Sequence, residues 1–103
     1  MATVTKKDII TRMSDTLGVT NAQSAQALDT LIDIISSALS RGDDVALRTF
    51  GTFEVRLTKA KLGRNPAQPH VAVPIPPRHV VRFKPGQELK DSVAALPVPA
   101  QGE

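Results

Sequence analysis

One stretch of this chain, Val55–Gln87, most limits the folds open to it, because it is rich in proline and β-branched residues. Proline cannot donate a hydrogen bond to a β-ladder, so within a sheet it belongs on an edge. Pro74 and Pro76 share parity, and both nitrogens can therefore face the unpaired side of a two-stranded ribbon. Pro77 has the opposite parity and predicts a bulge or the end of regular pairing. The stretch favours a long, exposed two-stranded β-arm over about residues 56–80, and not the central strand of a wide sheet.

The same stretch concentrates the positive charge of the chain. The whole protein has a formal net charge of +3, and Val55–Gln87 holds seven basic residues and no acidic one, so the remaining residues are net acidic. Such segregation creates a strong local potential for a polyanion, above all for the phosphate backbone of nucleic acid. The basic residues, which we interpret as phosphate or groove contacts, are Arg56, Lys59, Lys61, Arg64, Arg78, Arg82 and Lys84.

Two helices are predicted before this stretch. Thr5 followed by Asp8 is typical of a helix start, because both side chains can satisfy exposed backbone N–H groups, and Thr20 followed by Gln23 repeats the signal. A glycine follows each helix, where a left-handed cap can end it. The second helix carries an apolar stripe that is wider than one short partner helix would cover. A core within one chain and a self-associating face are both open interpretations of this stripe, which includes Leu28, Leu31, Ile32, Ile35 and Leu39.

The apolar pattern then changes from helical to alternating. The alternation begins at Val45 and extends through Phe50, and Gly51 permits a tight turn before the alternation resumes. A strand is expected to continue through Leu57 and Lys59 to a turn-rich segment at residues 63–66, with a return strand over about residues 71–83. Pro85 and Gly86 interrupt this pattern, a short helix follows, and residues 97–103 are expected to form a disordered tail. The fold class is therefore α+β, with a helical base of two N-terminal helices, a short antiparallel sheet extended into the β-arm, and a short C-terminal helix, in a single domain of residues 1–96.

Composition narrows the class of protein. With 103 residues the chain holds one domain at most. If the arm projects outward, roughly 70 residues remain to form a core, a size at which dimerisation is an economical source of stability. The chain has no cysteine, and His70 and His79 lack a neighbouring ligand cluster, so we expect no metal site. We also expect no catalytic residues and no cofactor. No segment has the apolar length of a membrane span or the character of a signal peptide, which favours a soluble intracellular protein with no membrane partner.

Three motifs in order resemble those of one family. They are Phe50–Arg56, Gly63–Pro66 and Val80–Lys90, and together they resemble the bacterial HU and integration host factor DNA-bending proteins over nearly the whole chain. The resemblance implies an intertwined dimer with a compact helical base and two β-arms that reach around DNA in its minor groove. The chain departs from the family pattern at Thr49, where glycine is usual. It also has Gln68-Pro69 where Thr-Gly is common, and one extra residue, expected near residues 67–72, should make a bulge or reshape the tip.

The resemblance also assigns roles to residues. Pro66 is an apolar wedge at an exposed turn and is expected to insert between base pairs, although Asn-Pro also fixes many ordinary turns. Arg64 and Asn65 are expected in the minor groove, where readout is degenerate, so sequence preference should be weak. Three residues match family positions near the base that can clamp flanking DNA, with a plain surface role equally open. They are Lys6, Gln87 and Lys90. The aromatic residues, which we expect in the dimer core, are Phe50, Phe53 and Phe83.

The predicted function is that of a non-enzymatic, largely sequence-tolerant protein that bends and compacts double-stranded DNA in the nucleoid. It is expected to prefer bent, nicked or junction DNA and to act as a homodimer, with a heterodimer as the alternative. A sequence-preferring subunit like those of integration host factor is a second interpretation. A structural or adhesive protein whose arms engage other polyanions is a third.

Overall fold

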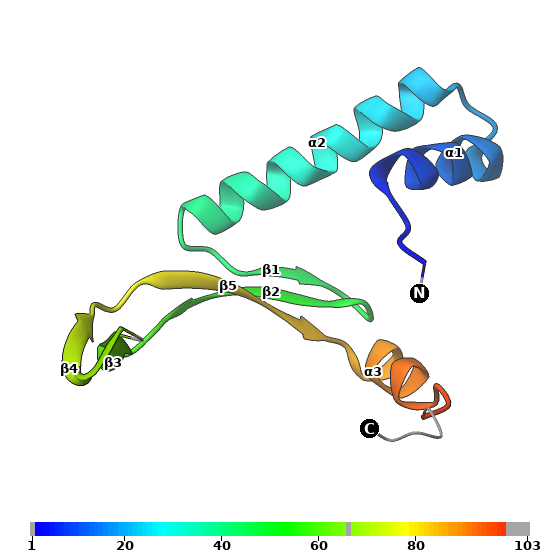
Figure 1. The fold of residues 1–103 in the computed structure, drawn as a ribbon. Coiled ribbons are helices and arrows are strands. Elements are labelled where there is room, and N and C mark those ends of the chain that lie inside the picture. Colours follow the sequence, from blue (N-terminus) through cyan, green and yellow to red (C-terminus); the bar gives the residue numbers. More distant parts are fainter. Residues whose placement is uncertain (1, 66, 99–103) are drawn as a thin grey trace. The chain divides into compact units, whose positions relative to one another are not determined.

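A computed structural model describes residues 2–65 and 67–98. The chain forms, in order, α1 (Lys6–Leu17), α2 (Asn21–Ser40), β1 (Val45–Leu47), β2 (Gly51–Leu57), β3 (Lys61–Asn65), β4 (Gln68–Ile75), β5 (His79–Pro85) and α3 (Gln87–Ala94) (Figure 1). This order of two helices, antiparallel strands and a final helix confirms the predicted α+β class. The chain divides into two compact units, Met1–Ala38 and Leu39–Glu103.

The first unit begins with the capped helix that the sequence predicts. The Thr5 N–H donates to Asp8 Oδ2 at 3.0 Å, and the Asp8 N–H donates to Thr5 Oγ1 at 3.3 Å. The hydrogen bond from the Thr5 backbone is the main reason why the pKa of the Asp8 carboxyl lies below its ordinary value. A hydrogen bond with the Thr5 side chain lowers this pKa further. The cap therefore stabilises the folded protein at pH values above the ordinary pKa of Asp8. This stabilisation is lost as the pH falls through the lowered pKa of the folded state. At the other end Gly18 adopts a left-handed φ of 69° and closes α1.

Small polar side chains join α1 to α2. The hydroxyls of Ser14 and Ser24 lie 3.0 Å apart in a hydrogen bond, and both serines are buried. Serine is small enough to let two helix backbones approach closely, and each hydroxyl supplies the other with a partner in the absence of water. At the surface, Lys6 Nζ forms an ion pair with Asp29 Oδ1 at 2.6 Å. These contacts fix the helix pair through polar groups, which leaves apolar side chains on its outer faces.

In the second unit, β1, β2 and β5 form an antiparallel sheet in the order β1-β2-β5 (Figure 1). The ladder between β2 and β5 runs without a shift from Gly51 opposite Pro85 to Leu57 opposite His79. Phe53 lies opposite Phe83, with ring centroids 4.9 Å apart, and Phe50 lies 5.2 Å from Phe83. The three phenylalanines therefore form one cluster at the α3 end of the sheet.

The predicted alternation through Phe50 is wrong, because β1 ends at Leu47 and a turn follows. The Phe50 N–H donates to the Leu47 carbonyl at 3.0 Å and closes this turn. The turn therefore precedes Gly51, where it was expected. Thr49 occupies the left-handed region, with a φ of 70°. This is the position where the family usually has glycine, and a β-branched residue is strained there. The turn is held from outside by the Gly86 N–H, which donates to the Phe50 carbonyl at 2.8 Å.

The strands of the predicted arm are also interrupted. Regular pairing stops after Leu57 and resumes at Lys61, and on the return side β4 and β5 are separated by residues 76–78. Pro77 explains the break, since its parity turns a nitrogen that cannot donate toward the partner strand, and the prediction that Pro77 ends regular pairing is confirmed. Pro76, expected in the ribbon together with Pro74, lies outside β4. The return strand was expected from about residue 71, whereas β4 already begins at Gln68.

The strained turn gives a stability prediction. Thr49→Gly should raise the free energy of unfolding by about 1 kcal/mol, because relief of left-handed strain outweighs the added freedom of the unfolded chain. Thr52→Gly, in the extended backbone of β2, is the matched control and should destabilise the protein. Urea unfolding at one fixed protein concentration measures both changes. A Thr49→Gly variant that is less stable than the parent chain would show that the turn is not strained.

Candidate nucleic-acid interface

The β-arm is a separate two-stranded sheet formed by β3 and β4. Lys61 lies opposite Ile75, and the register is regular as far as Arg64 opposite Ala72. It then shifts, so that Asn65 lies opposite Gln68. Residues 69–71, all within the described part of the chain, consequently have no opposite residue in the ladder and form a bulge on β4. The irregularity falls within residues 67–72, where one extra residue was expected, but it leaves three residues of β4 unpaired and not one.

A pair of hydrogen bonds joins the arm to the three-stranded sheet. The Thr58 N–H donates to the Arg78 carbonyl at 2.9 Å, and the Arg78 N–H donates to Thr58 Oγ1 at 3.0 Å. The threonine hydroxyl thus replaces a backbone acceptor at the place where regular pairing is lost. The two sides of the arm remain connected across the break.

Most of the predicted contact residues are exposed along the arm and its base. Arg56 lies on β2, Lys61 on β3, and Arg82 on β5, while the remaining exposed cations of this set are Lys59, Lys84 and Arg78. Arg64 and Asn65 belong to β3 by backbone. Pro66, the expected wedge, lies outside the described residues. The structure therefore places cations on the outgoing side of the arm and at its base, along one continuous part of the chain.

Arg56 has an acidic partner that the sequence analysis missed. Glu54 Oε1 accepts from Arg56 Nη2 at 2.8 Å and from Arg56 Nε at 3.1 Å. This hydrogen bond and the charge of Glu54 raise the pKa of Arg56, and Glu54 is itself mostly buried, with 18% of its side chain exposed. The signal was present in the sequence, because residues two apart on a strand share a face. Glu54 holds the guanidinium in one orientation at the start of the arm.

The three residues expected near the base differ in their surroundings. Lys6 is held by Asp29, as described above, and Gln87 Nε2 donates to Asp91 Oδ1 at 2.8 Å. Lys90 is exposed on α3. Lys6 belongs to the first unit, whereas Gln87 and Lys90 belong to the second.

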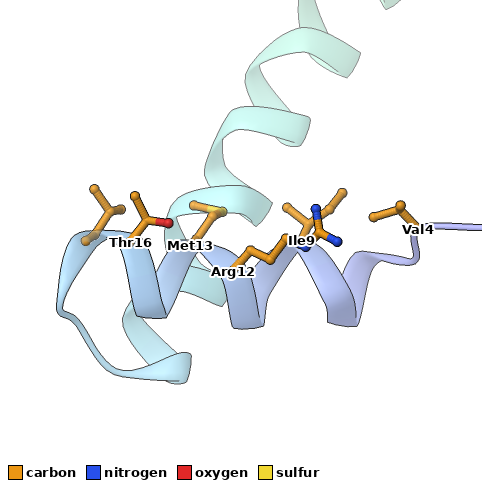
Figure 2. A pocket seen from close by; sticks show the side chains of 6 residues that line it. Val4, Ile9, Arg12, Met13 and Thr16 are labelled. Carbon is orange, nitrogen blue, oxygen red and sulfur yellow. The ribbon is translucent and has the colours of Figure 1, made fainter.

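A second surface of interest is an apolar groove on the first unit. Figure 2 shows side chains along one side of α1 and the residues before it, around a cavity of about 370 Å³. The groove offers few polar groups. Its lining residues are Val4, Ile9, Arg12, Met13, Thr16 and Leu17.

Across residues 2–65 and 67–98, no three His, Cys, Asp or Glu side chains gather in a way that could hold a metal ion. Within the same ranges, no helix has both the length and the apolar character needed to cross a membrane.

Comparison with known proteins identifies the family. The family model described as bacterial DNA-binding protein matches residues 4–94. The chain belongs to this family. Among relatives of this bacterial DNA-binding family, integration host factor subunit alpha of Paracoccus denitrificans is 39% identical over 94 residues, which covers 91% of each protein. The DNA-binding protein HU of Geobacillus stearothermophilus is 42% identical over 88 residues, covering 85% of this chain and 97% of that protein.

A solved structure agrees with this assignment. The chain resembles HU in a structure described as an Anabaena HU–DNA cocrystal, with a TM-score of 0.80 and 33% identity. The match covers 89% of this chain and 99% of the other. The predicted resemblance to HU and integration host factor is therefore confirmed. Membership of a bacterial DNA-binding family also agrees with the expectation that the protein is not an enzyme.

Proposed function

We propose that this protein binds double-stranded DNA and bends it through the minor groove, largely without sequence preference. The observation that carries the proposal is the β3–β4 arm, a two-stranded ribbon that lies inside a stretch with seven basic residues and no acidic one. Cations on such a ribbon neutralise phosphates and release the counterions condensed on DNA. The description of the similar Anabaena HU structure, a cocrystal with DNA, supports the same partner for this chain.

Pro66 completes the proposal, because in the sequence it directly follows Asn65, the last residue of β3. An apolar wedge between base pairs unstacks them and kinks the duplex, at a cost of about a few kcal/mol per step. Binding should therefore favour DNA that is already bent, nicked or branched, since part of that cost is then absent. We further propose that the protein acts in the nucleoid and that residues 1–96 work as one DNA-binding domain.

A sequence-preferring role is the second candidate. The 39% identity to integration host factor subunit alpha favours it, whereas the 42% identity to HU favours the sequence-tolerant role. Competition between one duplex and random-sequence DNA separates the two candidates. A specific protein binds its site about 10³–10⁷ times more tightly than other DNA, whereas a sequence-tolerant protein shows almost no such ratio.

The acting species is proposed to be a dimer. Leu31 and Ile32 of α2 are 45% and 43% exposed, and Phe50 and Phe83 are 47% and 40% exposed. Among residues 2–65 and 67–98, no apolar side chain is buried in the single chain. A second copy that covers these side chains and the groove on α1 would supply the missing core, and a homodimer needs no other gene product. Leu28, Ile35 and Leu39, each half-buried, extend the same face of α2.

The dimer proposal predicts that stability depends on protein concentration. Burying a leucine or isoleucine contributes about 1.5–3 kcal/mol, so a chain that buries them only in the dimer should lose this stability on dilution. The melting temperature should fall over a hundredfold dilution, and light scattering should give twice the chain mass. Monomeric mass together with an unchanged melting temperature would reject the dimer.

The exposed cations predict the salt dependence of binding. Lys61→Ala should weaken binding to all duplexes alike and reduce the slope of log affinity against log salt by about 0.9 in magnitude. Arg56→Ala should do the same if Arg56 exchanges Glu54 for a phosphate in the complex. Arg41→Ala, which removes an exposed cation outside the basic stretch, is the control and should leave the slope unchanged. An unchanged slope for Lys61→Ala would assign that lysine to the solvated surface.

The wedge predicts a separation of bending from binding. Smooth bending of a site of 20–30 base pairs costs on the order of 1–6 kcal/mol, and Pro66 would concentrate the deformation at one step. Pro66→Ala should keep its salt-sensitive affinity for nicked DNA but bend intact duplex less. Energy transfer across a doubly labelled duplex at saturating protein measures the bend, and Pro97→Ala is the control. Equal end-to-end distances for the parent chain and Pro66→Ala would mean that Pro66 is not the wedge.

A further inference from the structure

The two strands of the arm differ in chemistry. The outgoing path carries four cations from Arg56 to Arg64, whereas β4 and the two residues after it, positions 68–77, contain no Lys, Arg, Asp or Glu. Adjacent strands lie only about 4.8 Å apart, so a ribbon that enters a groove brings both strands with it. Any contact that β4 makes with DNA must therefore be made by uncharged side chains.

The register places the apolar side chains of β4 on a defined face. Residues opposite each other in an antiparallel ladder share a face, so Ile75 lies with Lys61, and Val73 lies with Gly63. Gly63 keeps this face flat, because a Cβ at that position would stand 2.8 Å from Ile75 Cδ1. The Ile75 side chain thus reaches across the space that a larger residue would fill. We name Lys61, Gly63, Val73 and Ile75 the arm apolar face.

This face is open in the structure, with Val73 43% and Ile75 38% exposed. On the opposite face, Leu62 lies opposite Pro74 and is 71% exposed. The arm apolar face combines two branched apolar side chains with one cation at its border. A minor groove offers the complementary pattern, with apolar deoxyribose walls bordered by phosphates.

We infer that the arm apolar face packs Val73 and Ile75 on the sugars of the minor groove while Lys61 reaches the bordering phosphate. The inference rests on the proposed function and assigns a separate task to each strand. β3 supplies the salt-sensitive part of the affinity through counterion release. β4 supplies a salt-insensitive part, because burying apolar surface releases no counterion.

The test is a double variant, Val73→Thr with Ile75→Thr, which keeps β-branching and therefore the ribbon. Affinity for one duplex is measured by fluorescence anisotropy over a series of salt concentrations. The loss of apolar contact should weaken binding about tenfold at every salt concentration and leave the log–log slope unchanged. Lys61→Ala, by contrast, should change the slope. Circular dichroism and the melting temperature verify that the double variant folds as the parent chain does.

Leu62→Thr on the opposite face is the matched control and should leave affinity near that of the parent chain. Three results would overturn the inference: parent-like affinity of the double variant, a change of slope in place of a parallel shift, or an equal loss for Leu62→Thr. In the first case the face does not contact DNA. Failure of the parent chain to bind duplex DNA would instead reject the proposed function, and this inference with it.

Discussion

The ladder between β2 and β5 is the interaction on which the arm depends. Its register is continuous over the whole length of both strands and brings Phe53 against Phe83 at one end and Leu57 against His79 at the other. The arm begins where this ladder ends, and the Thr58–Arg78 hydrogen bonds transmit the pairing across the irregular residues. A ribbon of two strands is marginal by itself in water, so its attachment to a sheet with an aromatic cluster is what keeps it formed.

The arm also shows how charge and pairing are distributed between two strands. Cations occupy the outgoing side and the base, where Glu54 orients Arg56, while the return side of the ribbon is uncharged and interrupted by a bulge. Electrostatic attraction is strong, long-ranged and indifferent to sequence, whereas apolar contact requires a close fit. The proposed combination would let the protein approach any duplex by electrostatic attraction and then fix the position of its arm by apolar contact.

Much of this fold follows from local rules in the sequence. Thr5 and Asp8 were enough to place the start of α1, because a capping box needs only residues three apart. The interruption after Ile75 followed from the prolines, whereas the irregularity on β4 was expected from the resemblance, because the return path is one residue longer than is usual in that family. Local rules failed at Thr49, whose left-handed backbone lies in a turn that approaches Gly86, far along the chain. The Glu54–Arg56 pair depends on which residues share a face of β2, and a count of charges over the whole stretch does not contain that information.

The prolines of the arm have a consequence for the behaviour of many copies together. An exposed apolar ribbon is a template on which further strands can add, and such growth leads to aggregates. Proline can occupy a ladder position only where its nitrogen faces away from the partner strand, so Pro74 leaves the outer edge of β4 without a donor at that point. Lys61 adds mutual repulsion between arms. The arm can therefore expose valine and isoleucine at high protein concentration without the addition of further strands to its two-stranded sheet.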